Sequence, residues 1–396
     1  MQSFQYYIKT NVVFGEGSVC RTAELVKKHG GSRVLVVYGG GSAKRSGLLD
    51  RVFALLDEAL LPYDSIGGVQ PNPRVELARE GVKRAVEFRA DLILAVGGGS
   101  VIDTAKAIAH GAANPETDIW EFWKRREVLT RSTPVGVILT IPASGSETSD
   151  SAVLTNEQEC EKRGLNTDLN RPAFAILDPK LAMTLPPRQV SCGVTDILMH
   201  TLDRYFTPAD DNELTDALAE ALLRVVIRNG PKVVENENDL HAMSEIMWAG
   251  SLSHNNLTGL GGVKDFSVHQ FGHELSGMFD AAHGATLSVM WPQWARYVVD
   301  TDPARFAHYG EAVWRLTRKD GESDRDLALR AIDTTEEFFR SIDMPTTFTE
   351  LGIGVLSEEQ LRELAERCTF FHTRVVGKFC PLDYDGILAV YRMANK

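Results

Sequence analysis

The stretch DLILAVGGGSVIDTAKAIA, residues 91–109, decides the fold of this chain. Residues 92–96 form an unbroken apolar run, which is typical of a strand covered on both faces within a parallel sheet. Three glycines and Ser100 follow, and then the apolar pattern takes the spacing of a helix. A strand, a glycine-rich turn and a helix in this order predict half of a βαβ unit, whose turn lies where open parallel sheets bind ligands.

The same alternation extends through the first half of the chain. Further β-rich runs occupy residues 33–38 and 135–140, and a helical pattern covers residues 48–60. Strands that alternate with helices predict a parallel sheet flanked by helices. We therefore expect an α/β, Rossmann-like N-terminal domain.

The second half has a different pattern from about residue 186 onward, after the breakers Asp178-Pro179 and Pro186-Pro187. Its segments are long, helically periodic and poor in β-branched runs, as in residues 213–229, 324–342 and 358–368. We expect an all-α C-terminal domain, with domains at residues 1–186 and 187–396 and a site between them.

Two predicted strands end in glycine clusters, YGGGS at residues 38–42 and VGGGS at residues 96–100. At a helix start, backbone N–H groups and the helix dipole can hold a pyrophosphate where side chains are absent. Structural turns also use glycine, for positive φ, so one such cluster is weak evidence by itself. Neither cluster has the G-x-G-x-x-G spacing of the usual dinucleotide fingerprint.

The first cluster bears on the choice of nucleotide, because an acid after an early strand usually accepts a hydrogen bond from the ribose 2′-OH of NAD. No acid is present here, and Gly40 and Ser42 leave room for a 2′-phosphate. Lys44 and Arg45 could supply positive charge, although such residues are most often solvated surface charges. The pattern favours NADP(H).

Four residues of the second half could form a site for a divalent transition metal. Asp196 and His200 are spaced i and i+4, so a helix places them on one face. His269 and His283 are 14 residues apart, which on one straight helix would separate them by about 21 Å. If both bind one ion, the chain must turn between them, and we expect helix, turn and helix there. A single histidine of this kind is more often a hydrogen-bonded core residue than a ligand.

Composition narrows the class of protein. The 396 residues carry a formal net charge of −12 and are 43% hydrophobic, which argues for a globular chain and against nucleic acid or an anionic membrane as partner. The N-terminus lacks a signal-peptide pattern and no apolar run could span a bilayer, so we expect a cytoplasmic protein. Five cysteines without a C-x-x-C pair are typical of reduced thiols.

Five motifs in one order make the chain resemble the iron-containing (group III) alcohol dehydrogenases, and in particular the NADPH-dependent aldehyde reductase and butanol dehydrogenase branch. The resemblance covers nearly the whole chain. The motifs are GGGSVIDTAK at residues 97–106, PASGSE at 142–147, LPPRQ at 185–189, Asp196-x-x-x-His200 and GHEL at 272–275.

The resemblance implies a dinucleotide-binding domain followed by a helical metal-binding domain, and a homodimer. It places the ligands of one divalent ion, Fe(II) or Zn(II), on Asp196, His200, His269 and His283. It places His273 near the nicotinamide as a candidate catalytic residue. The NADP(H) contacts that it implies are Gly40, Ser42, Asn72, Gly98, Gly99, Ser100, Asp103, Thr140, Ser144 and Lys162.

The implied activity is a metal-dependent interconversion of primary alcohols and aldehydes, of the butanol and butanal kind, by hydride transfer with NADP(H). The chain departs from the family at Val101, where many members have proline, and in the charged residues 155–170, which align loosely around Lys162. Trp120, Phe122 and Trp123 are candidates for an apolar substrate wall, although tryptophans usually belong to a core. The alternatives are a dehydroquinate-synthase-like lyase, which needs a basic cluster that we do not find, and a non-catalytic binding protein.

Overall fold

A computed structural model describes residues 1–159, 161–208 and 211–396. Its contacts divide the chain into two compact units. The sheet unit consists of Tyr7–Leu185 and Gly250–Asn255, and the helical unit consists of Met1–Tyr6, Pro186–Ala249 and Asn256–Lys396. The boundary between Leu185 and Pro186 lies where the sequence pattern changes. The predicted ranges 1–186 and 187–396 differ from the two units in two short segments, because Met1–Tyr6 belongs to the helical unit and Gly250–Asn255 to the sheet unit.

A six-stranded, all-parallel sheet forms the centre of the sheet unit, with the order β1-β8-β5-β4-β2-β3. From β2 the chain goes to β3 on one side and then returns to β4 on the other side. The carboxyl ends of β2 and β4 therefore flank the topological switch point, where open α/β sheets bind ligands. The strands are β1 (Asn11–Phe14), β2 (Val34–Gly39), β3 (Tyr63–Val69), β4 (Leu92–Gly97), β5 (Val135–Leu139) and β8 (Phe174–Leu177).

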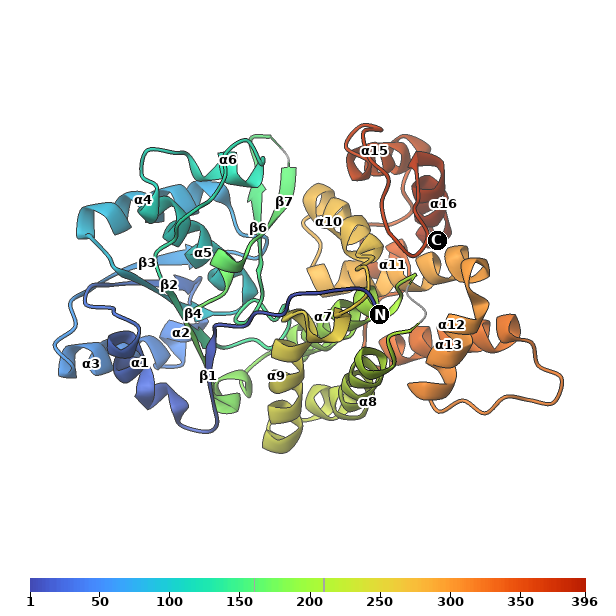
Figure 1. Ribbon diagram of the computed structural model, residues 1–396, viewed down its shortest axis with the longest axis horizontal. Helices are drawn as coiled ribbons and strands as arrows, with labels where there is room; N and C mark the ends of the chain where they lie inside the picture. The colour runs from blue at the N-terminus through green and yellow to red at the C-terminus, as the bar shows by residue number, and fades with distance from the viewer. Residues whose placement is uncertain (160, 209–210) are drawn as a thin grey trace. The chain divides into compact units, whose positions relative to one another are not determined.

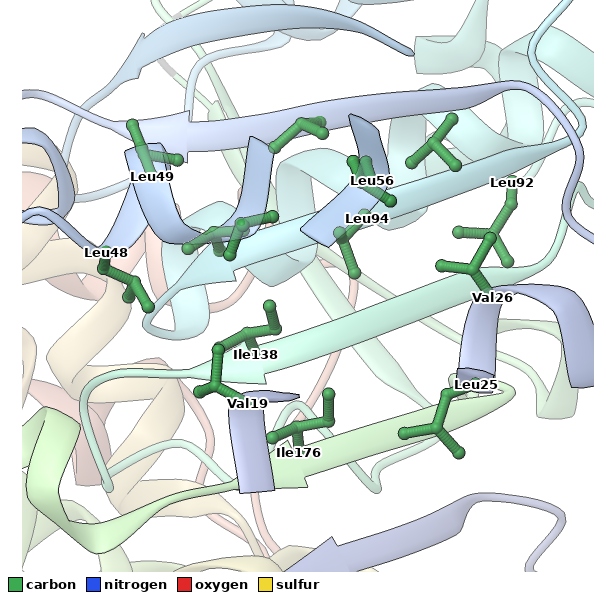
Figure 2. Packing of buried hydrophobic residues seen from close by; sticks show 14 of the residues in the cluster. Val19, Leu25, Val26, Leu48, Leu49, Leu56, Leu92, Leu94, Ile138 and Ile176 are labelled. Atoms are coloured by element: carbon green, nitrogen blue, oxygen red, sulfur yellow. The ribbon is translucent and has the colours of Figure 1, made fainter. Parts of the chain in front are cut away.

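Helices cover both faces of this sheet (Figure 1). On one face, α1 (Thr22–Lys28) and α3 (Leu48–Glu58) pack their apolar stripes on alternate residues of the strands. Figure 2 shows side chains of α3, including Leu56, pointing toward strand residues such as Leu94 and Ile138 in this core. The opposite face is covered by α4 (Val75–Phe88) and α5 (Gly99–Ala113). Two-sided burial explains why the central strands β2, β4, β5 and β8 are nearly continuous apolar runs.

A two-stranded antiparallel hairpin, β6 (Ser151–Asn156) and β7 (Glu161–Asn166), extends from the same unit. Alternate residues of β6 are buried, which is typical of a strand with one covered face. The remaining elements of the unit are η1 (Ser18–Arg21), α2 (Ser42–Arg45), α6 (Ile119–Trp123), η2 (Asp168–Asn170) and η3 (Pro179–Ala182).

The other unit is built of helices and short helical turns. The helices at residues 213–235, 324–341 and 358–368 bury one stripe each, as their periodic sequences predict, whereas those at residues 187–205 and 283–298 have long runs of consecutive buried residues. The longer helices are α7 (Pro187–Tyr205), α8 (Glu213–Glu235), α9 (Leu240–His254, whose residues from Gly250 onward belong to the sheet unit), α10 (Ser267–Phe279), α11 (His283–Val298), α12 (Pro303–Ala312), α13 (Asp324–Ser341), α15 (Glu358–Cys368) and α16 (Tyr384–Ala394). The short elements are η4 (Leu257–Gly259), η5 (Val299–Thr301) and α14 (Phe348–Leu351).

The predicted fold class is confirmed, with a parallel sheet and covering helices first and a helix-rich second half. Among the described residues, no helix is both long and apolar enough to cross a membrane. Four of the five cysteines are described and all four are free thiols, whereas Cys160 lies outside the described residues.

Candidate metal centre and nucleotide-binding turns

Helix α7 carries two of the four candidate metal ligands. Asp196 and His200 are one turn apart, both are buried, and the Nδ1 atom of His200 lies 3.4 Å from Oδ1 of Asp196. The predicted i, i+4 geometry is therefore present, and it directs the carboxylate and the imidazole to one point.

The other two candidates lie on either side of a helix break. His269 is in the first turn of α10, which ends at Phe279, and Asp280 then takes a left-handed conformation with φ of 50°. His283 is the first residue of α11. The predicted helix, turn and helix is confirmed, and it brings the rings of His269 and His283 to a centroid separation of 5.3 Å.

A close approach between α11 and α7 positions His283. A Cβ atom on Gly284 would lie 2.3 Å from the carbonyl oxygen of Cys192, so only glycine fits at this point of α11. Cys192 is one turn before Asp196 on α7. His283 consequently lies beside Asp196, although the two are 87 residues apart in sequence (283 minus 196).

One carboxylate oxygen of Asp196 lies close to a ring nitrogen of each of the three histidines. The Oδ1 atom of Asp196 is 3.4 Å from Nδ1 of His200, 3.6 Å from Nε2 of His269 and 3.7 Å from Nε2 of His283. A tetrahedral ion with metal–ligand bonds of about 2.0–2.2 Å has ligand atoms about 3.3–3.6 Å apart. The separations to His200 and His269 thus match the edges of a coordination polyhedron, that to His283 is slightly longer, and all three exceed those of ordinary hydrogen bonds.

Unpaired polar atoms provide an independent test of whether a cation fits. Among the described residues, Oδ1 of Asp196 and Nε2 of His269 are buried and have no hydrogen-bond partner. Such groups cost free energy unless a water, an ion or a protein group satisfies them. One carboxylate and three imidazoles form a donor set suited to divalent first-row metals, so the residues present fit the ion.

The charges around His269 favour a cation at this place. Burial lowers the pKa of His269, but the carboxylates of Asp203 and Asp196 outweigh it and raise the pKa to about 9. The His269 Nδ1 atom is hydrogen-bonded to Oδ2 of Asp203, a residue of α7 that is only 1% exposed. Asp203 was not among the site residues predicted from the sequence. Its signal was its spacing, because residues 196, 200 and 203 follow the i, i+4, i+7 pattern of one helix face.

A fourth histidine of the region lies beside the cluster. His273 is one turn after His269 on α10, and its ring is 5.4 Å from the ring of His283 and 6.4 Å from that of His269. Asp196, His200 and His269 form a group of mutually close ligand atoms, and both His273 and His283 lie outside that group. Its position is compatible with a contact to a bound molecule.

In the sheet unit, the second glycine cluster joins β4 to α5 at the switch point. Gly97, Gly98 and Gly99 do not have positive φ values, so conformational freedom is not the reason for them. A Cβ atom on Gly99 would lie 2.3 Å from Oγ of Ser144, and one on Gly98 would lie 2.9 Å from the Ile141 side chain. These glycines are needed for close packing beside the first turn of α5.

Other candidate cofactor residues follow neighbouring strands. Gly40 and Ser42 come directly after β2, Ser100 lies in the first turn of α5, and Thr140 follows β5. The amide of Thr140 donates to the carbonyl of Gly97 at 3.0 Å, which links the two strand ends. All of these positions lie at the carboxyl edge of the sheet.

Asn72 and Lys162 are 90 residues apart in sequence but adjacent in the structure. The Lys162 Nζ atom donates to Oδ1 of Asn72 at 2.9 Å. Lys162 is in β7, so the hairpin brings this side chain to the loop after β3. The structure therefore brings together two candidates that the sequence could relate only through the family resemblance.

Asp103 has an internal role whatever else it contacts. Its Oδ1 accepts from Oγ of Ser146 at 2.6 Å and its Oδ2 accepts from the amide of Val153 at 2.9 Å. Lys106, one turn along α5, donates to the same Ser146 hydroxyl at 2.8 Å and to the carbonyl of Ser151 at 2.7 Å. Burial lowers the pKa of Lys106 to about 8, and the charge of Asp103 opposes that shift. Both side chains fasten residues 146–153 to the helix that begins at the glycine turn.

The expected apolar substrate wall is not formed by the α6 aromatics. Trp120, Phe122 and Trp123 are between 1% and 3% exposed. The indole of Trp123 donates to the carbonyl of Ala152 and that of Trp120 to Glu159. These rings are core residues that anchor the hairpin, so this expectation was wrong.

Comparisons with known proteins agree with the geometry. The model of the iron-containing alcohol dehydrogenases matches residues 9–179, and that of the C-terminal part of the Fe-containing alcohol dehydrogenase family matches residues 190–395. The chain therefore belongs to the iron-containing alcohol dehydrogenase family. It is an oxidoreductase that uses a nicotinamide cofactor and a divalent metal ion.

Individual relatives are similar over most or all of their length. NADH-dependent butanol dehydrogenase A of Clostridium acetobutylicum is 37% identical over 393 residues, which cover 99% of both chains. The NADPH-dependent aldehyde reductase YqhD of Escherichia coli is 35% identical over 357 residues, covering 89% of this chain and 90% of the relative. The solved NADH-dependent butanol dehydrogenase A of Thermotoga maritima superposes with a TM-score of 0.95 at 29% identity, covering 100% of this chain and 99% of the other.

Proposed function

We propose that this protein is a metal-dependent, NADP(H)-linked oxidoreductase that interconverts primary alcohols and aldehydes of the butanol and butanal class. The observation that supports it most is the convergence of three imidazoles on the Oδ1 atom of Asp196 at 3.4–3.7 Å. The proposal assigns Asp196, His200, His269 and His283 as the ligands of one ion, either Fe(II) or Zn(II). The donor set does not distinguish these two metals.

The chemistry divides between the ion and the chain. A bound divalent ion supplies a Lewis acid that polarises the oxygen of an alcohol or aldehyde. Asp196 contributes one negative charge, and the histidines bind through neutral nitrogens, so acid pH should release the ion as they protonate. The burial of Asp196, His200 and His269 keeps water from competing with the substrate oxygen.

We propose that the sheet unit holds the nicotinamide dinucleotide along the ends of β2, β4 and β5. The pyrophosphate would take backbone N–H groups around Gly98, Gly99 and Ser100 at the start of α5, beside the Ser144 hydroxyl. Thr140 and Ser144, with the pair Asn72 and Lys162, would contact the rest of the cofactor. Asp103 would act mainly by holding residues 146–153 in place.

The preference for NADP(H) rests on the loop after β2. A Cβ atom on Gly40 would meet nothing within 4 Å, so this loop has open space and no carboxylate beside it. Ser42, Lys44 and Arg45 form the short helix α2 directly after it. Room and positive charge together favour a 2′-phosphate. The relatives include both NADH-dependent and NADPH-dependent enzymes by name, so the preference has to be measured.

We propose His273 as the residue that contacts the reacting groups beside the ion. Its support is its position next to the His283 ring and one helical turn after His269. A His273→Ala variant should keep its bound metal and lose turnover. Unchanged rates across the pH range in that variant would remove His273 from the mechanism.

The experiment that tests the proposed function is NADPH oxidation followed at 340 nm with butanal as substrate. The protein is assayed as purified, after chelation, and after addition of Fe(II) or Zn(II), with NADH in parallel. We expect activity that disappears on chelation, returns with one metal and is higher with NADPH. Activity that is indifferent to chelation would contradict the ligand assignment. Binding of metal and NADPH without turnover of any aldehyde would favour the alternative, a non-catalytic binding protein.

A second candidate, a lyase of the dehydroquinate synthase type, has no particular observation in its favour. Both family models that match the chain are those of alcohol dehydrogenases. The homodimer that the family resemblance implies stays part of the proposal, and sedimentation equilibrium of the purified protein tests it.

A further inference from the structure

Asp203 forms a buried hydrogen bond to a candidate metal ligand from the opposite side to the ion. It lies on α7, one turn beyond His200, and its Oδ2 atom is paired with Nδ1 of His269. A carboxylate accepts hydrogen bonds, so the shared proton resides on Nδ1 and the lone pair of Nε2 is left for an ion. That Nε2 atom is the one that faces Oδ1 of Asp196 at 3.6 Å.

The backbone around this pair is fixed as well. The amide of Asp265 donates to the carbonyl oxygen of Asp203 at 2.8 Å. The Asp265 carboxylate then accepts from the amide of Ser267, at the start of α10, at 2.9 Å. Its other oxygen accepts from the amides of Lys378 and Phe379 at 2.7 and 2.8 Å. The first turn of α10, which carries His269, is thereby tied to the end of α7.

Charge gives Asp203 a second effect. Asp196 and Asp203 place two buried carboxylates around the cluster, while the histidines bind an ion as neutral groups. Two negative charges balance one divalent cation, and an uncompensated charge in a buried site is costly. The next charged groups that face Asp203 are Asp265 and Arg204, which act on its charge in opposite directions.

We propose that Asp203 is a positioning residue of the metal centre, which orients the His269 imidazole and supplies the second negative charge that a divalent ion needs. The proposal rests on the metal site of the proposed function. Partners of this kind, on the far nitrogen of a ligating histidine, typically change metal affinity by about 10–100-fold when they are removed.

The test compares the affinity for Zn(II) in the full-length wild type and in Asp203→Asn. Asparagine keeps the size of the side chain and an oxygen that can accept from Nδ1, and it removes only the charge. We measure the dissociation constant of Zn(II) by competition with a chelator and expect it to rise by about 10–100-fold in the variant. An Asp203→Ala variant removes the hydrogen bond as well and should bind still more weakly.

A matched control separates this effect from general damage to a buried carboxylate. Glu336 on α13 is also buried and ion-paired, with Arg296 at 2.6 Å and Arg340 at 2.6 Å, within the same unit. Glu336→Gln should leave the Zn(II) dissociation constant unchanged even if the protein unfolds at a lower temperature. The absorption spectrum of the Co(II)-loaded protein should change in both Asp203 variants and stay as in wild type in Glu336→Gln.

The outcomes distinguish this proposal from the proposed function. Wild-type affinity and a wild-type Co(II) spectrum in Asp203→Asn and Asp203→Ala, with a metal-binding wild type, would overturn the role of Asp203 alone. A wild type that binds neither Zn(II) nor Co(II) would overturn the metal centre itself. Equal weakening in Asp203→Asn and Glu336→Gln would assign the loss to folding and would also overturn the proposal.

Discussion

His110 is a buried histidine of α5 whose two ring nitrogens are both occupied inside the protein. Nε2 pairs with Oδ1 of Asn170 at 2.8 Å and Nδ1 with Oγ of Ser132 at 2.8 Å. The Asn170 amide nitrogen donates to two backbone carbonyls, so its oxygen must accept and Nε2 of His110 carries the proton. Burial lowers the pKa of His110 to about 4, and the ring is therefore neutral in the folded protein at neutral pH.

This neutral histidine predicts a pH dependence of stability. Because the folded pKa lies below the unfolded value of about 6.5, only the unfolded chain takes up the proton as the pH falls from 6.5 toward 4. His110 should thus cost about 2 kcal/mol of unfolding free energy between pH 7 and pH 5. Denaturant unfolding at both pH values should show this extra loss in wild type and not in His110→Gln. Equal losses in the two proteins would show that His110 does not titrate as described.

Gly40 allows a direct test of the cofactor preference. Its φ is not positive and a new Cβ atom meets nothing within 4 Å, so Gly40→Asp should fold normally. A carboxylate there would accept from the 2′-OH of NAD and repel a 2′-phosphate. We expect the ratio of kcat/KM for NADPH to that for NADH to fall by about 100-fold, which is about 2.7 kcal/mol.

Gly40→Ala is the control for this substitution, because it adds the same Cβ atom without the charge. It should keep the wild-type preference in the same kinetic measurement. If the ratio is the same in Gly40→Asp as in Gly40→Ala, the loop after β2 does not contact the 2′ position.

Among individual residues, the predictable ones were metal-binding types of side chain that recur at the spacing of a helical turn. Asp196 and His200 are such a pair, and their geometry is as expected. Asp203 was missed because a carboxylate at the end of an amphipathic helix is usually solvated, and only the fold shows that it faces His269. Trp120 and Trp123 were misassigned because nothing local distinguishes a core ring from a pocket ring.

The approach of α11 to α7 is the element-level feature on which the metal centre depends most. In Gly284→Ala the new methyl group would lie 2.3 Å from the Cys192 carbonyl oxygen, a backbone atom that cannot move away cheaply. We expect a loss of about 1–3 kcal/mol of unfolding free energy, as is usual for overpacking, together with weaker Zn(II) binding, because His283 would shift with the helix. Denaturant unfolding and chelator competition measure the two effects.

Gly277 provides the matched control on the neighbouring helix. It lies within α10, and a Cβ atom there meets nothing within 4 Å. Alanine favours a helix over glycine by about 1 kcal/mol, so Gly277→Ala should be neutral or stabilising and should keep the metal affinity. Wild-type metal affinity in Gly284→Ala would show that the close contact does not position His283.

Elements with strong periodicity were predictable, and those defined by long-range pairing were not. The strand at β4 and the helix at α15 have the bounds that their patterns indicate, within a residue or two. The hairpin of β6 and β7 was not expected, because β7 has the sequence EKRGLN, which lacks a β-type apolar pattern, and none of its residues is fully buried. Only pairing with β6 makes this segment a strand, and that pairing is what brings Lys162 to Asn72.

For the whole molecule, the order of fold classes along the chain was predictable because parallel strands and amphipathic helices have different periods. The sheet order was not, since β1 pairs with β8 at an edge although more than 150 residues separate them. The two short segments that exchange units also carry no local signal. The pairing of distant strands and the assignment of short segments to a unit depend on tertiary packing, which no single stretch of the sequence reveals.

We propose above all that Asp196, His200, His269 and His283 hold one divalent ion. The most direct test of this proposal is the metal content of the purified protein by elemental analysis, after loading with Zn(II) and removal of excess, in wild type and in His269→Ala. We predict one ion per chain in wild type and a large loss in His269→Ala, with His308→Ala, a histidine that instead pairs with Glu220, as the control that keeps its ion. One retained ion per chain in His269→Ala, or none in wild type, would contradict the assignment of these four residues as metal ligands.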